Sequence, residues 1–199
     1  MTTNNPPGVL LPGATKSYHL NHFMLRTTDP TSTLHFYLDL MGMRTVFTLN
    51  AGPFTIYYLG YPATDADRAD VARWAERTAH IPTLTRTLGL LEFYYMHGSE
   101  NVSSGNIPPN LGFGHLGFSV PDVGEAVERL RGEGVRVIKE LGEVGRETVP
   151  ISEWEVSRGI AHEALQGGFL RIWARIACVE DPNGYMVELV PQDMEGMTS

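Results

Sequence analysis

Two histidines and two glutamates recur at matching places in the two halves of the sequence. His22 in the first half and His115 in the second are each followed, seven residues later, by an aspartate. Glu92 lies 70 residues after His22, and Glu188 lies 73 residues after His115. A repeat of this length indicates one supersecondary unit used twice. Two such units, paired about a pseudo-twofold axis, would bring two imidazoles and two carboxylates towards one point.

These four side chains form a candidate metal site. Two imidazoles and two carboxylates suit one divalent ion, with Zn²⁺ or Ni²⁺ favoured and Fe²⁺, Mn²⁺ or Co²⁺ also compatible. Taken singly, a histidine on a strand is more often an ordinary hydrogen-bonded residue, and a glutamate could face solvent from an edge strand. Both glutamates, however, lie in apolar segments. Burying an unpaired carboxylate is costly, and a dication compensates both carboxylates at once.

The chemistry expected of such a site is proton transfer next to a chelated pair of oxygens. Four protein ligands leave two coordination positions, which can take water or two adjacent substrate oxygens. The metal would then stabilise an enediolate by Lewis acidity. A ligand glutamate that detaches from the metal would act as the base for the neighbouring C–H.

The first half of the chain predicts one strand, one helix and three further strands. Asp29 is a suitable N-cap for the helix, Pro30 suits its first position, and Gly42 ends it. Thr64 and Asp67 have the spacing of a capping box and begin a helical insert over residues 62–87. The strands are expected over residues 18–27, 45–49, 54–59 and 88–96.

The second half repeats this plan, with Asp122 as the N-cap of its helix. The segment 142–168 is too long for a plain hairpin loop. Because it contains Trp154, Ile160 and His162, we expect an ordered flap in preference to a flexible linker. The strands are expected over residues 112–120, 136–139, 170–179 and 185–190.

These elements predict an α+β fold of two modules. The first module covers residues 18–98 and the second covers residues 112–191. The remaining segments are a flexible N-terminal arm over residues 1–17, a linker over residues 99–111 and a tail over residues 192–199.

Composition excludes several classes of function. The chain has 199 residues and a net charge of −8, and no cluster of Lys and Arg offsets that charge, which argues against nucleic acid binding. There is no apolar run long enough to span a membrane, and we expect that the N-terminal residues are not a secretory signal. Cys178 is the single cysteine, so no disulfide forms within the chain. We expect this cysteine to be buried core and the protein to be cytoplasmic.

Several segments together resemble the glyoxalase I family of the vicinal oxygen chelate superfamily. The stretch around His115 is highly specific, and Asp-Pro-Asn-Gly-Tyr before Glu188 is characteristic of the whole superfamily. The resemblance covers most of residues 18–140 and 176–191. The segments that carry it are 22–30, 36–37, 41–43, 112–123 and 181–189.

The resemblance implies a fold, a reaction and a site. The family fold pairs βαβββ modules into a cupped, eight-stranded mixed sheet around the metal, usually in a homodimer with composite active sites. The family reaction isomerises the hemithioacetal of methylglyoxal and glutathione. By position, the metal ligands would be His22, Glu92, His115 and Glu188. Glu188 would be the main acid and base, with Glu92 sharing the work.

The family's substrate clamps are only partly present. Arg26 and Lys139 match an arginine and a lysine of the family's glutathione clamp, whereas Met96 and Leu111 stand where the family has an asparagine and an arginine. The loss of polar clamps predicts a bulkier, more apolar substrate than the glutathione adduct. The alternatives are an isomerase, lyase or dioxygenase acting on an oxygenated polyketide or phenolic metabolite, or a non-catalytic small-molecule binder, which intact ligands disfavour.

Overall fold

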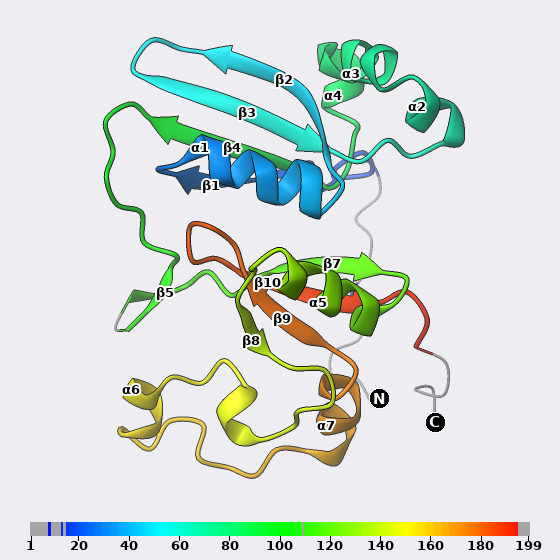
Figure 1. Cartoon of the computed structure of the whole chain (residues 1–199). Coiled ribbons are helices and arrows are strands. Elements are labelled where there is room, and N and C mark those ends of the chain that lie inside the picture. Colours follow the sequence, from blue (N-terminus) through cyan, green and yellow to red (C-terminus); the bar gives the residue numbers. More distant parts are fainter. Residues whose placement is uncertain (1–7, 9–12, 14, 109, 195–199) are drawn as a thin grey trace. The chain divides into compact units, whose positions relative to one another are not determined.

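The computed structural model describes residues 8, 13, 15–108 and 110–194, and the chain divides into two compact units, one ending at Val102 and one beginning at Ser103. Each unit contains a four-stranded sheet (Figure 1). Most of the predicted arm over residues 1–17 and the end of the predicted tail over residues 192–199 lie outside the described residues. Among the described residues, no helix is long and apolar enough to cross a membrane.

The first unit follows the predicted order of strand, helix and three strands. Its sheet order is β1-β4-β3-β2, with β1 parallel to β4 and the other neighbours antiparallel. Its strands are β1 (His22–Thr27), β2 (Arg44–Asn50), β3 (Phe54–Gly60) and β4 (Leu90–Met96). Its helices are α1 (Pro30–Leu34), the π-helix His35–Leu40, α2 (Asp65–Ala69), α3 (Val71–Ala79) and α4 (Ile81–Leu84).

One face of this sheet packs against α1 and the π-helix. Leu25 and Phe93 are buried on this face, and Tyr37 lies with its ring centroid 4.9 Å from that of Phe93. Side chains alternate between faces along a strand, so His22, Met24 and Arg26 lie on the opposite face. The predicted alternation is therefore confirmed over residues 24–27, whereas Phe23 is exposed.

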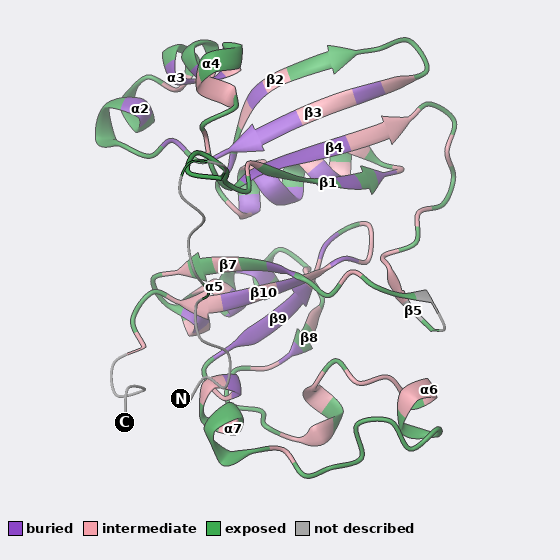
Figure 2. Cartoon of the chain, turned by 180° about the vertical axis from the view of Figure 1, so that it is seen from behind, coloured by how far each residue is buried: buried purple, intermediate pink, exposed green. Residues whose placement is uncertain are grey.

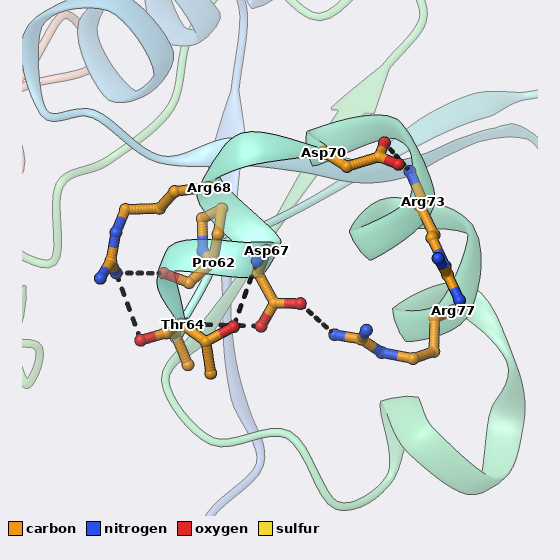
Figure 3. A network of polar contacts seen from close by, with 8 residues as sticks. Pro62, Thr64, Asp67, Arg68, Asp70, Arg73 and Arg77 are labelled. Carbon is orange, nitrogen blue, oxygen red and sulfur yellow. Dashed lines mark hydrogen bonds and ion pairs between the residues drawn. The ribbon is translucent and has the colours of Figure 1, made fainter.

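The predicted insert over residues 62–87 is helical and partly covers that opposite face. Trp74 of α3 packs with Tyr58 of β3 and Leu90 of β4 in one buried cluster. Figure 3 shows the polar network that holds the insert's first turn. Thr64 and Asp67 form the predicted capping box, and Arg77 Nη2 donates to Asp67 Oδ1 at 2.6 Å.

The second unit repeats the module and adds a small hairpin. Its main sheet has the order β7-β10-β9-β8, with β7 parallel to β10. Its strands are β5 (Asn106–Ile107), β6 (Asn110–Leu111), β7 (Leu116–Val120), β8 (Val137–Lys139), β9 (Ala177–Glu180) and β10 (Met186–Pro191). Its helices are α5 (Val123–Gly132), the 3₁₀ turn Arg146–Thr148, α6 (Glu153–Val156) and α7 (Gly167–Trp173).

The two faces of the second main sheet have different neighbours. On one side, α5 contacts β10. Val127 and Leu130 of α5 are buried, as are Val187 and Leu189 of β10. On the other side, the segment between β8 and β9 contributes Trp173, which packs in a cluster with Cys178. Figure 2 shows buried residues along β9 and β10, whereas the segment around α6 is mostly exposed or half-buried. The burial of Cys178 confirms its predicted place in the core.

Three predicted strands and one helix need correction. The strand predicted over residues 18–27 begins at His22, because the side chain of Asn21 bonds to carbonyls of the insert. The strand predicted over residues 112–120 begins at Leu116, where pairing with β10 begins. The predicted linker contains the β5–β6 hairpin.

The prediction of a strand over residues 170–179 is wrong for its first part, which forms α7 (Gly167–Trp173). A short apolar run fits a helix as well as a strand. The helix expected to run to Gly42 begins as predicted, with Asp29 accepting from Thr31 and Ser32, but it changes to a π-helix at His35. The α+β class and the two βαβββ modules are nevertheless confirmed.

Candidate metal site

The first histidine–glutamate pair lies where β1 runs beside β4. Glu92 pairs in register with Met24, two residues beyond His22 on the same face of the sheet. This arrangement places His22 Nε2 3.5 Å from Glu92 Oε2. The imidazole is more than a third exposed and the carboxylate is nearly buried, with side-chain exposures of 38% and 10%.

The second pair repeats this geometry in its own unit. Glu188 pairs in register with Gly117, two residues beyond His115. His115 Nε2 lies 3.4 Å from Glu188 Oε2, and the side-chain exposures are 39% and 15%. The sequence repeat is therefore a repeat of strand register and of side-chain geometry.

Asn21 fixes which nitrogen of His22 carries the proton. The Asn21 Nδ2 group donates to the carbonyls of Leu84 and Thr87, at 2.8 and 2.6 Å. Asn21 Oδ1 is therefore the atom that faces His22 Nδ1, at 2.8 Å, and it can only accept. This network assigns the proton to Nδ1 and leaves Nε2 with a lone pair directed towards Glu92.

Two hydrogen-bond acceptors consequently face each other in the first pair. In the neutral imidazole, Nε2 and the Glu92 carboxylate would both present lone pairs, and only a proton or a metal cation satisfies both. Burial raises the pKa of the Glu92 carboxyl, and His22 opposes this shift. The chemistry of this donor set fits a divalent ion held by Nε2 and a carboxylate oxygen.

The residues beside the two glutamates differ. In the first sheet, Tyr58 is opposite Glu92 in register, and its ring centroid lies 5.4 Å from that of His22. Burial, with the charge of Glu92, raises the pKa of Tyr58 to about 12. The phenol therefore stays protonated beside the first pair.

In the second sheet, a thiol and an amine take the corresponding places. Cys178 is opposite Glu188, and Lys139 is opposite Cys178 in the next strand. Burial, with the charge of Glu188, raises the pKa of the Cys178 thiol to about 11. The sequence had given no signal for Tyr58 or Cys178 as neighbours of the site, because cross-strand register is not visible in it. Asn21 could have been found, since it directly precedes His22.

The structure places the predicted substrate residues in different settings. Arg26 and Met96 lie on the strands and the sheet face that carry the first pair, since they follow Met24 and Glu92 with even spacing. Leu111 is exposed at 38% in the second unit. Lys139 is buried, and its Nζ donates to the carbonyls of Glu140 and Ile176, at 3.0 and 2.6 Å. Burial lowers the pKa of this amine.

Each unit thus contributes one imidazole and one carboxylate. Within the part of the chain that the structure describes, no group of three or more His, Cys, Asp or Glu side chains lies close enough to hold a metal ion. A metal site with four protein ligands would need one His22–Glu92 pair and one His115–Glu188 pair.

Comparisons with known sequences identify the family of the chain. Residues 19–189 match the family model described as the Glyoxalase/Bleomycin resistance protein/Dioxygenase superfamily. A lactoylglutathione lyase of Pseudomonas aeruginosa is 33% identical over 204 residues, which cover 98% of this chain and 95% of that protein. Glyoxalase I of Saccharomyces cerevisiae is 29% identical over 184 residues, 89% of this chain. The chain spans only 46% of the length of the yeast protein.

Solved structures show the same fold. The trypanothione-dependent glyoxalase I of Leishmania major superposes with a TM-score of 0.53 at 20% identity, over 88% of each chain. Glyoxalase I of Zea mays gives a TM-score of 0.53 at 19% identity, over 86% of this chain and 43% of the maize chain. From its two modules and the extent of the sequence match, the chain belongs to the glyoxalase/bleomycin resistance protein/dioxygenase superfamily.

Proposed function

We propose that this protein is a metal-dependent lyase of the glyoxalase I type. His22, Glu92, His115 and Glu188 would be the protein ligands of one divalent ion, with Zn²⁺ or Ni²⁺ preferred. The proposal rests on one observation in the first pair. Two hydrogen-bond acceptors, His22 Nε2 and Glu92 Oε2, face each other at 3.5 Å. The second pair has nearly the same spacing, with His115 Nε2 3.4 Å from Glu188 Oε2. The names of the relatives support the lyase class.

The reaction would be a proton transfer between two adjacent carbons of the substrate. When bound, the metal would supply Lewis acidity towards two neighbouring substrate oxygens. Glu188 would take the proton from one carbon and return it to the next, and Glu92 would share this work. His22 would act only as a ligand, since Asn21 already occupies its Nδ1.

The register supports Glu188 as the more mobile of the two carboxylates. Gly117 stands opposite Glu188, and even a Cβ added there would lie 3.8 Å from Glu188 Oε2, an ordinary contact distance. Met24 stands opposite Glu92, and Tyr58 flanks it on the other side. A carboxylate beside a glycine has more room to leave a metal and accept a proton.

The substrate would carry an apolar group. Met96 and Leu111 cannot form charge-assisted hydrogen bonds, and Lys139 already donates to two carbonyls. The segment after β8 brings Val149 and Trp173 into the cluster that contains Cys178, opposite Glu188. This apolar border favours a hemithioacetal of an apolar thiol or aldehyde over the glutathione adduct. The alternative is an isomerisation, lyase or dioxygenase reaction on an oxygenated polyketide or phenolic compound.

The proposal also includes a homodimer with composite sites and a cytoplasmic location. An unpaired module leaves a sheet edge that favours a partner. A small-molecule substrate is the other partner that the site needs.

Metal content and reconstitution test the proposal. The protein is purified without chelators, its metals are measured by mass spectrometry, and the stripped protein is titrated with Zn²⁺ and Ni²⁺. We expect about one divalent ion for each pair of modules and isomerase activity only in the loaded protein. His22→Ala and His115→Ala should each abolish tight binding. A protein that takes up no divalent ion under these conditions contradicts the proposal.

A further inference from the structure

The segment between β8 and β9 borders an open cavity of its own. The cavity measures about 590 Å³ and is lined within residues 146–169. This volume lies within the usual range of small-molecule sites, about 300–1,000 Å³. None of the four candidate metal ligands lines it.

The walls of the cavity are fixed by contacts within the second unit. Gly142 N donates to Ala174 O at 2.9 Å, which closes the base of the segment. Trp173 Nε1 donates to Thr148 Oγ1 at 2.8 Å. Phe169, which lines the cavity, stacks on Trp173 with ring centroids 5.7 Å apart. These contacts hold the two ends of the segment that borders the cavity.

Arg146 is a cavity residue with an unsatisfied donor. Its Nη1 donates to Glu163 O at 2.7 Å. Its Nη2 is buried and has no hydrogen-bond partner among the described residues. A buried donor without an acceptor is costly, above all on a charged group. The Nη2 atom itself is covered, so a ligand carboxylate would reach it only after the covering side chains shift, and it would then supply the missing acceptor and a compensating charge.

The rest of the lining selects among anions. Ile151, Leu165 and Phe169 provide apolar walls, which a fully polar ion could not use. Glu163 also lines the cavity, so its negative charge disfavours ligands with more than one charge. The lining therefore suits one carboxylate group attached to an apolar body.

We propose that this cavity is a binding site for a small amphipathic monocarboxylate. The carboxylate binds Arg146, and the apolar body packs against Ile151, Leu165 and Phe169. This site uses no residue of the proposed metal chemistry, so its existence can be tested independently of that function.

Calorimetric titration of the full-length protein with three probes tests the proposal. Octanoate has both the charge and the apolar chain, octan-1-ol lacks the charge, and inorganic phosphate lacks the chain. We expect octanoate to bind the wild type at least tenfold more tightly than either of the other probes. Arg146→Met should weaken octanoate binding by roughly ten- to a hundredfold, as expected for loss of a charge-assisted hydrogen bond.

Two further variants separate binding from folding. Ala164→Phe fills the cavity but keeps Arg146, and it should also weaken octanoate binding at least tenfold. Arg158→Met removes an exposed arginine of the same segment, which packs over Trp154 at 4.2 Å outside the cavity lining, and it should bind octanoate as the wild type does. If Arg146→Met has a lower melting temperature than the wild type, octanoate binding by Ala164→Phe decides whether the proposal holds. No octanoate binding by the wild type, equal binding by Ala164→Phe, or phosphate or octanol binding as tightly as octanoate would overturn the proposal.

Discussion

Asn21 Oδ1 accepts a hydrogen bond from His22 Nδ1 at 2.8 Å, while the other end of the same amide is held by two backbone carbonyls. The amide therefore cannot turn without placing its oxygen against other oxygens. This contact aims the lone pair of His22 Nε2 at Glu92. A partner of this kind on the second nitrogen is typical of metal-bound histidines and raises their basicity.

The first prediction follows from this contact. Asn21→Ala should lower the affinity for Zn²⁺ or Ni²⁺ by roughly ten- to a hundredfold, because the imidazole loses its fixed orientation and tautomer. Competition with a chromophoric chelator measures the affinity. Asn101→Ala, at an exposed site before the unit boundary, is the matched control. Unchanged affinity in a correctly folded Asn21→Ala protein would show that the tautomer argument is wrong.

The sequence was sufficient to predict the modules because the chemistry is repeated in it. The residues His22 and His115 precede helix caps at the same distance, and the caps themselves, Asp29 and Asp122, form as predicted. Position in a repeat is a long-range signal, and it identified pairs of residues that the fold brings within 3.5 Å.

Local sequence patterns predict burial less reliably where a helix gains one extra residue in a turn, because the extra residue changes which side chains face the sheet. The spacing after Asp29 predicts an apolar stripe of Leu34, Tyr37, Leu38 and Met41. Tyr37 is buried as predicted, but the π-helix also buries Phe36 and Leu40. The other three residues of the stripe are only half-buried. A π-turn is rare and is usually a single-turn insertion within an α-helix, so the 3.6-residue spacing of apolar residues does not predict it. Cross-strand neighbours such as Tyr58 are equally hidden, since register depends on contacts far apart in the chain.

The second prediction concerns the two glutamates. Glu188→Gln keeps a ligand oxygen but cannot accept a proton, so it should retain metal and lose about 10²–10⁴-fold in turnover. Glu92→Gln should lose less, because Glu188 would still be able to move the proton. Glu76→Gln, on the exposed surface of α3, should leave turnover unchanged. Near-normal turnover in Glu188→Gln would exclude the assigned role.

The third prediction concerns substrate choice. Turnover of the methylglyoxal–glutathione hemithioacetal should be poor, because Met96 and Leu111 remove two polar clamps. The double variant Met96→Asn, Leu111→Arg should raise kcat/KM for this substrate by roughly ten- to a hundredfold. Leu88→Arg, at another exposed leucine, should not. A wild-type kcat/KM above about 10⁶ M⁻¹s⁻¹, within the range of efficient enzymes, would show that the substrate is the glutathione adduct itself.

The fourth prediction is a pH dependence of stability. The hydrogen bond from Arg77 holds the pKa of Asp67 below its usual range, with Thr64 contributing further. A carboxyl with a lowered pKa stabilises the fold above its unfolded value, about 3.9, and this contribution is lost as the pH falls through the folded value. The difference in unfolding free energy between wild type and Asp67→Asn should therefore shrink between about pH 5 and pH 2. Asp65→Asn, at an exposed carboxylate of the same helix, should show a much smaller change. A difference that stays constant with pH would contradict the prediction.

The last prediction concerns how the two pairs of ligands meet. If His22 and His115 of one metal site belong to different chains, His22→Ala and His115→Ala are each inactive as homodimers. A mixed dimer has one site that carries both substitutions and one site that carries neither. Mixing the unfolded chains and refolding them together should therefore restore up to about half of the wild-type activity per mixed dimer, while each variant refolded alone stays inactive. The double variant His22→Ala, His115→Ala, refolded with either single variant, is the control and should restore none. If the mixed refolding also restores none although mass spectrometry shows mixed dimers, the two histidines act within one chain.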